Sequence, residues 1–142
     1  MNEQSNPRLV NCTFNGNKSS RGGAMYSNCS VTIVNCILWN DTPDEISLKG
    51  TSATVEYCDV QGGCPGQGNI SEDPLFAGAP GIEYRLQAGS PCIDAGSSVA
   101  IPADVVDVDG DGSTTEQIPW DFAGNPRVTG RSVDIGAREF GR

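Results

Sequence analysis

The residues with the most definite chemistry lie in segment 107–113, Asp-Val-Asp-Gly-Asp-Gly-Ser. Alternating carboxylates followed by glycine match the first half of a calcium-binding loop, in which oxygen ligands surround a hard cation. The glutamate expected at the twelfth loop position is Ile118 here, and Glu116 lies two residues earlier. Asp104 and Asp121 could complete a non-standard site, and the alternative is an acidic, solvated turn without a metal. The predicted calcium ligands are Asp107, Asp109, Asp111, Ser113 and Glu116.

A second set of charged residues lies towards the C-terminus. Asp94, Asp121 and Asp134 could form a carboxylate cluster for acid–base chemistry on sugars. The alternative, which we favour, is that they accept hydrogen bonds from backbone amides at turns. Arg127 and Arg138 could pair with these acids, and Arg127 is the one candidate for a catalytic base. A salt bridge is the preferred interpretation of Arg127.

Aromatic residues and sequons raise two questions about sugars. Trp39, Tyr57, Trp120 and Phe122 could form a sugar-stacking platform, although aromatic residues in a chain of this size more often belong to the core. Asn17 and Asn40 are the most plausible glycosylation sites, if an export pathway glycosylates the chain. Asn-Xaa-Ser/Thr sequons occur at Asn11, Asn17, Asn28, Asn40 and Asn69.

Composition excludes several classes of function. The chain has 142 residues and no histidine, which removes Ser-His-Asp and Cys-His catalysis and histidine metal ligation. Its formal net charge is −9, and the chain lacks the clustered lysine and arginine residues that are typical of a nucleic-acid-binding protein. No apolar run approaches the roughly 18 residues that a membrane-spanning helix needs. Residues 1–4 lack the basic segment of a secretory signal, and we expect a mature form or a fragment.

Internal repeats organise the first half of the chain. Cys12, Cys36 and Cys58 are 24 and then 22 residues apart, and each is followed two residues later by an apolar side chain. A period of 22–24 residues with strand-like composition suits one coil of a β-solenoid. Asn11 and Asn35 precede two of these cysteines, and asparagine tolerates the left-handed conformation of a sharp bend between short strands. Tyr57 departs from that pattern in the third repeat.

The repeat also predicts the state of its side chains. Stacked strands lie about 4.8 Å apart, so the three repeat cysteines would have parallel Cβ directions, which is poor geometry for a disulfide. We therefore expect buried, reduced thiols. The pairing of Cys29, Cys64 and Cys92 stays open, and a Cys64–Cys92 bridge is one possibility. Since side chains alternate along a strand, the residues after the repeat cysteines should face outward. These residues are Thr13, Ile37 and Asp59.

Several strings resemble a known family. FNGN at 14–17 and GGAM at 22–25 resemble the repeats of polymorphic outer-membrane proteins. The C-terminal half is similar to right-handed parallel β-helix surface proteins of the choice-of-anchor Q type. The strings that carry this similarity are NISEDPLF at 69–76, YRLQAGSPCIDAG at 84–96, DFAGNPR at 121–127 and VDIGARE at 133–139. The resemblance implies a β-helix exported to a bacterial surface, hence an extracellular or cell-surface location, without an assigned activity.

Together these observations predict one all-β domain over 1–142, a short right-handed parallel β-helix. Regular coils would span 9–69, irregular coils 70–142, and the acidic loop 104–116. We expect a non-catalytic structural or adhesive module, stabilised by calcium, that stacks end to end into a filament. Its partners would be copies of itself or missing upstream coils, at an N-terminal edge that residues 1–8 are too short to cap. The alternatives are a fragment of a calcium-dependent polysaccharide lyase and a carbohydrate-binding surface.

Overall fold

A computed structural model describes residues 6–78 and 84–141. The fold is all-β and its sheets are parallel, as predicted. One short 3-10 helix, η1 (Ser98–Ala100), lies in the C-terminal half. The strands are β1 (Arg8–Val10), β2 (Thr13–Asn15), β3 (Met25–Ser27), β4 (Val31–Val34), β5 (Ile37–Trp39), β6 (Ile46–Leu48), β7 (Ala53–Glu56) and β8 (Asp59–Val60).

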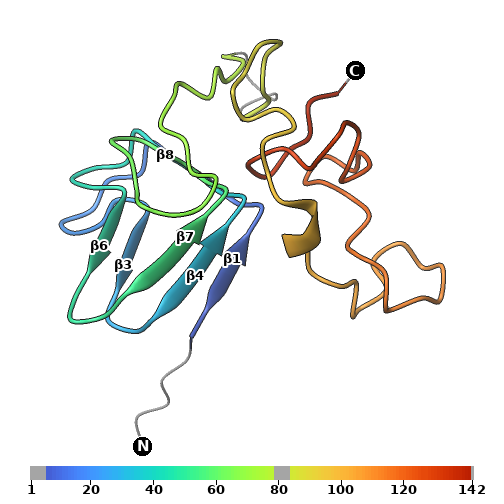
Figure 1. Cartoon of the computed structure of the whole chain (residues 1–142), viewed down its shortest axis with the longest axis horizontal. Coiled ribbons are helices and arrows are strands. Elements are labelled where there is room, and N and C mark those ends of the chain that lie inside the picture. Colours follow the sequence, from blue (N-terminus) through green and yellow to red (C-terminus); the bar gives the residue numbers. More distant parts are fainter. Residues whose placement is uncertain (1–5, 79–83, 142) are drawn as a thin grey trace, which may run out of the picture.

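The first two repeats each supply one strand to each of three sheets, and the third repeat supplies β7 and β8 to two of them. The sheet orders are β1-β4-β7, β2-β5-β8 and β3-β6, so corresponding strands of successive repeats are neighbours. Figure 1 shows β1, β4 and β7 side by side, and β3 beside β6. Leu9 pairs with Ile33 and Ile33 with Val55, which confirms the alignment of the repeats. The same holds one strand later, where Phe14 pairs with Leu38 and Leu38 with Val60.

Sharp bends separate the first two strands of each repeat. Asn11 and Asn35 have φ values of 52° and 54°, which confirms the predicted left-handed bends. Tyr57 adopts φ 51° at the equivalent place, although its side chain lacks the local hydrogen bonding that favours asparagine there. The bend is therefore imposed by the pairing of the flanking strands.

The interior of the repeats is apolar and contains the three repeat cysteines. Ile33, Cys36, Leu38 and Cys58 are fully buried, and all six cysteines of the chain are free thiols. This confirms the expected reduced thiols and the burial of Cys36 and Cys58, whereas Cys12 is only half-buried, and Cys64 and Cys92 form no bridge. The ladder is directional, because the backbone N–H of Cys12 donates to Sγ of Cys36 and that of Cys36 donates to Sγ of Cys58, both at 3.4 Å.

The outward-facing residues are covered. Ile37 is 1% exposed and Asp59 is 0% exposed, so facing outward does not place them in solvent. Ile37 packs in a second apolar cluster with Leu86, Cys92 and Ile135, while Sγ of Cys92 lies 3.2 Å from Oδ2 of Asp59. These residues face away from the repeat interior, as predicted, but the C-terminal half, whose described residues form none of the named strands, lies against the sheet of β2, β5 and β8 and covers them.

Backbone hydrogen bonds fix this second layer to the repeats. The N–H of Gly136 donates to the Asn35 carbonyl at 2.8 Å, and the N–H of Ala137 donates to Oγ1 of Thr13 at 3.0 Å. The Asn35 side chain accepts from the N–H of Ser97 at 2.7 Å and donates to its carbonyl at 3.0 Å. One amide side chain thus replaces a strand partner for Ser97.

The two ends of the repeat stack differ. At the far end, the N–H of Tyr57 donates to the Gln67 carbonyl, and Oδ1 of Asn69 accepts from the N–H of Cys58 at 3.0 Å. At the near end, β1, β2 and β3 each have one neighbouring strand within the described ranges. The prediction that residues 1–8 leave this edge uncapped falls partly on residues 1–5, which lie outside the described residues. Across the described parts of the chain, no helix is long and apolar enough to span a membrane.

Candidate functional site

The acidic loop 104–116 is closed at its base by a short antiparallel contact. Ala103 and Gln117 form a β-bridge, and the N–H of Asp104 donates to the Glu116 carbonyl at 2.8 Å. A second bond joins the N–H of Ile118 to the Pro102 carbonyl at 2.9 Å. This closure brings Asp104 and Glu116, at opposite ends of the loop, side by side.

Two groups of carboxylates are close enough to share a cation. Asp104, Asp109 and Glu116 have ligand oxygens within 4.8 Å of one another, and so do Asp107, Asp109 and Asp111. Asp109 belongs to both groups. Carboxylate oxygens are the ligands that Ca²⁺ prefers, and its coordination tolerates irregular geometry. The loop can therefore hold a metal ion, although exposed acidic groups also occur without one.

Asp104 distinguishes this loop from a solvated acidic turn. It is 1% exposed; its Oδ2 accepts a hydrogen bond from the N–H of Val108 at 2.8 Å, and its Oδ1 is buried without a partner. Oε1 of Glu116 is buried without a partner as well. Leaving a buried carboxylate oxygen unsatisfied is costly, and a bound cation would remove that cost.

The predicted ligand set is partly brought together. Of the predicted ligands, Asp107, Asp109 and Asp111 lie together in one group, and Asp109 and Glu116 lie together in the other. The hydroxyl of Ser113 instead donates to Oε2 of Glu116. Asp104 stood outside the main predicted set because it precedes the recognisable motif by three residues. Asp121, the other residue considered as a completing ligand, belongs to neither group of carboxylates.

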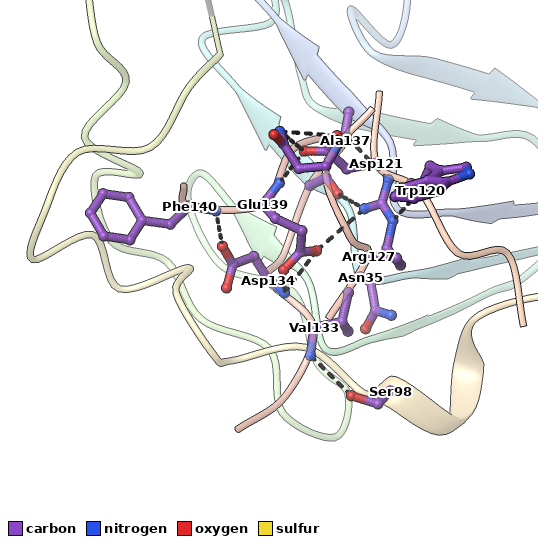
Figure 2. A network of polar contacts seen from close by, with 12 residues as sticks. Asn35, Ser98, Trp120, Asp121, Arg127, Val133, Asp134, Ala137, Glu139 and Phe140 are labelled. Carbon is purple, nitrogen blue, oxygen red and sulfur yellow. Dashed lines mark hydrogen bonds and ion pairs between the residues drawn. The ribbon is translucent and has the colours of Figure 1, made fainter. Parts of the chain in front are cut away.

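Asp121 instead belongs to a buried polar network in the C-terminal half (Figure 2). Arg127 Nη1 lies 3.5 Å from Oε1 of Glu139, and its guanidinium also donates to the carbonyls of Trp120, Gly136 and Ala137. Both partners of this contact are buried: Arg127 is 8% exposed and Glu139 is 2% exposed. The salt bridge that we preferred for Arg127 is present.

The acids of this network cap backbone amides. Oδ1 of Asp121 accepts from the N–H groups of Ala123 and Asn125, and Oδ2 accepts from that of Glu139. Asp134 accepts from the N–H of Asp94 at 2.8 Å and from that of Phe140 at 2.6 Å. Asp94 accepts from Arg131 at 2.7 Å and from Ser132 at 3.2 Å. The preferred structural interpretation of Asp94, Asp121 and Asp134 therefore holds.

Burial dominates the proton affinities of the network. It raises the pKa of Glu139 to about 8, with a contribution from the nearby Asp134. Burial also raises the pKa of Asp134 and lowers that of Arg127. For Asp121, burial alone would raise the pKa, but hydrogen bonds from Asn125 and from backbone amides outweigh it and lower the pKa.

The other candidate residues lie apart. Trp39 packs against the second apolar cluster, and the Tyr57 hydroxyl accepts from Nε2 of Gln67 near the far end. Trp120 and Phe122 line a common cavity, so the four aromatic residues do not form a single platform. Of the sequon residues, Asn17 donates its side-chain amide to Asp41, while Asn40 is exposed. Glycosylation of both stays a prediction.

Comparison with known proteins adds no relative. No protein-family model, curated protein or solved structure matches the chain significantly. The similarity to choice-of-anchor Q proteins thus stays a prediction from the quoted strings.

Proposed function

We propose that the chain is a non-catalytic structural module, a short right-handed parallel β-helix that acts at a bacterial cell surface. The observation that carries this is the directional side-chain ladder, which links each repeat to the next. Backbone N–H groups of Cys12 and Cys36 donate to the following cysteine sulfur, and Asn69 takes the equivalent place after Cys58. Such stacking gives a stiff rod whose stability grows with each coil.

The near edge of the stack is where a further coil would bind. β1 and β2 each lack a second neighbouring strand among the described residues, and unpaired strand edges favour pairing with another chain. The amide oxygen of Asn15 is buried there without a partner. Either an upstream coil or another copy of the chain would satisfy these groups. Residues 64–70 cover the far end, so a filament of copies would need this cover to move.

Calcium at the acidic loop would stiffen the C-terminal half. Asp104 supplies a buried, unpaired oxygen, and Asp107, Asp109, Asp111 and Glu116 supply the others. The lyase alternative is less well supported, because Arg127 is committed to a salt bridge and to three carbonyl groups.

Hydrogen exchange tests the coil-adding edge. We expect the amides of β1 and β2 to gain protection as protein concentration rises in millimolar calcium, while those of central strands β4 and β5 stay protected throughout. Unchanged exchange at β1 and β2 at every concentration would contradict self-association through this edge. Cleavage of a uronate polymer by the chain, lost in Arg127→Ala, would instead favour the lyase.

A further inference from the structure

A cavity of about 620 Å³ lies between the corner at Asn11–Phe14 and the C-terminal half. Most of its walls come from residues beyond position 84, so it is formed by the contact between the two halves of the chain. Its volume falls within the roughly 300–1,000 Å³ range of small-molecule binding sites. The cavity is separate from the acidic loop.

Aromatic rings surround this cavity and are poorly covered. Trp120 is 42% exposed, Tyr84 is 43% exposed and Phe122 is 80% exposed, and all three line it together with Phe14. Exposed large apolar side chains that gather at one hollow indicate a surface for a ligand. Flat aromatic faces suit a ring that is apolar on its face and polar at its edge.

Asn11 contributes a hydrogen-bonding group without a partner. It occupies the same repeat position as Asn35, with nearly the same backbone φ. Asn35 uses both ends of its amide to bind the backbone of Ser97, whereas Oδ1 and Nδ2 of Asn11 are both buried and unpaired. An amide that must both donate and accept matches hydroxyl groups, which do the same.

Arg138 contributes a positively charged side chain to the cavity. Its Nε is buried without a hydrogen-bond partner, and its guanidinium lies 5.7 Å from the centre of the Phe122 ring. Asp121 also lines the cavity, but both of its oxygens already accept backbone or amide hydrogen bonds. The cavity therefore presents an unpaired cationic donor, and a ligand carboxylate would satisfy it with a charge-assisted bond.

We propose that this cavity binds a carboxylated saccharide. One sugar ring lies against Trp120 and Phe122, its hydroxyls bond the Asn11 amide, and its carboxylate bonds Arg138. A neutral sugar would leave Arg138 unpaired. A peptide strand would call for a row of backbone partners, whereas the unpaired groups of this cavity are one amide and one guanidinium nitrogen.

Tryptophan fluorescence tests this binding directly. In a Trp39→Phe background, Trp120 is the sole tryptophan, and it reports on the cavity. The probes are digalacturonic acid and its methyl ester, which differ in charge but share the same rings. We expect saturable quenching by the acid and at least about tenfold weaker binding of the ester, from the loss of one charge-assisted hydrogen bond.

Three variants separate the contributions. Arg138→Gln should weaken binding of the acid about tenfold and leave binding of the ester unchanged. Arg131→Gln makes the same charge change at an exposed position outside the cavity and should leave both unchanged. Asn11→Gly removes the amide while glycine accepts the positive φ, and it should weaken acid and ester equally, by about tenfold.

Equal binding of acid and ester, or no saturable quenching by either, would overturn the proposal. Tighter binding of a short peptide with a free carboxyl terminus than of the sugar acid would also overturn it, in favour of a peptide site. Circular dichroism of each variant verifies folding. Sugar binding does not require self-association or calcium. Fluorescence therefore tests the sugar site, while hydrogen exchange and light scattering test the structural function, and either proposal can fail without the other.

Discussion

The buried Glu139 makes the stability of the chain depend on pH in a definite direction. Its carboxyl is 2% exposed and lies beside Asp134 and Asp121, with Arg127 as its cationic partner. Because burial raises its pKa from 4.5 to about 8, the folded chain holds a proton between these values that the unfolded chain releases. Stability is therefore highest at the acidic end of this window and is lost as the pH rises through about 8.

The size of the effect follows from the shift. Each pKa unit corresponds to about 1.4 kcal/mol, so the full shift sets a ceiling of about 5 kcal/mol. Arg127 and the neighbouring acids share that energy, and we expect about 2 kcal/mol between pH 5 and pH 8. Glu139→Gln keeps an oxygen that accepts from Asp134 and Arg127 but cannot ionise.

Urea unfolding of the chain and of Glu139→Gln at several pH values, under reducing conditions, measures this difference. We expect the free energy of unfolding of the natural chain to fall relative to that of Glu139→Gln by about 2 kcal/mol from pH 5 to pH 8. Asp44→Asn, at an exposed carboxylate, is the matched control and should show no such divergence. Parallel profiles for the natural chain and Glu139→Gln would refute the reasoning.

Three further predictions concern the loop, the bends and the second layer. Calcium at a hundredfold excess over its Kd should raise the free energy of unfolding by about 2 to 3 kcal/mol. Asp104→Asn should abolish this gain, whereas Glu72→Gln, which changes an exposed carboxylate outside the loop, should preserve it. Equal gains in both variants would contradict the site. Asn35→Gly should destabilise the chain by about 1–2 kcal/mol more than Asn11→Gly, since it loses both bonds to Ser97; equal costs in thermal unfolding would show that these bonds contribute nothing. Ile37→Ala should cost about 2–4 kcal/mol in urea unfolding, whereas Val99→Ala, at a residue 91% exposed, should cost less than about 0.5 kcal/mol; a small cost at Ile37 would mean that the second layer packs loosely.

The repeats could be predicted because one local rule recurs in them. The spacing of Cys12, Cys36 and Cys58 gave the strand register, and asparagine before the first two gave the left-handed bends, as the structure shows. Tyr57 shows the limit of that rule, because there the strand pairing overrides the residue preference.

The cover over Ile37 and Asp59 could not be predicted in the same way. It depends on contacts with Leu86, Cys92 and Ile135, which are distant in sequence and belong to no periodic pattern. The signal available in the sequence was the apolar Ile37 at a position expected to face outward. Asp104 was not in the main predicted ligand set for a related reason. The β-bridge between Ala103 and Gln117 places it beside Glu116, and no local sequence pattern indicates this bridge.

Particle mass by light scattering, in millimolar calcium and again after EDTA, tests the structural function most directly. A calcium-stabilised module that adds coils at the edge of β1 and β2 predicts particles larger than the 14.9 kDa chain in calcium, and their return to smaller mass after EDTA. A mass of 14.9 kDa in both conditions, at every protein concentration, would contradict calcium-linked self-association.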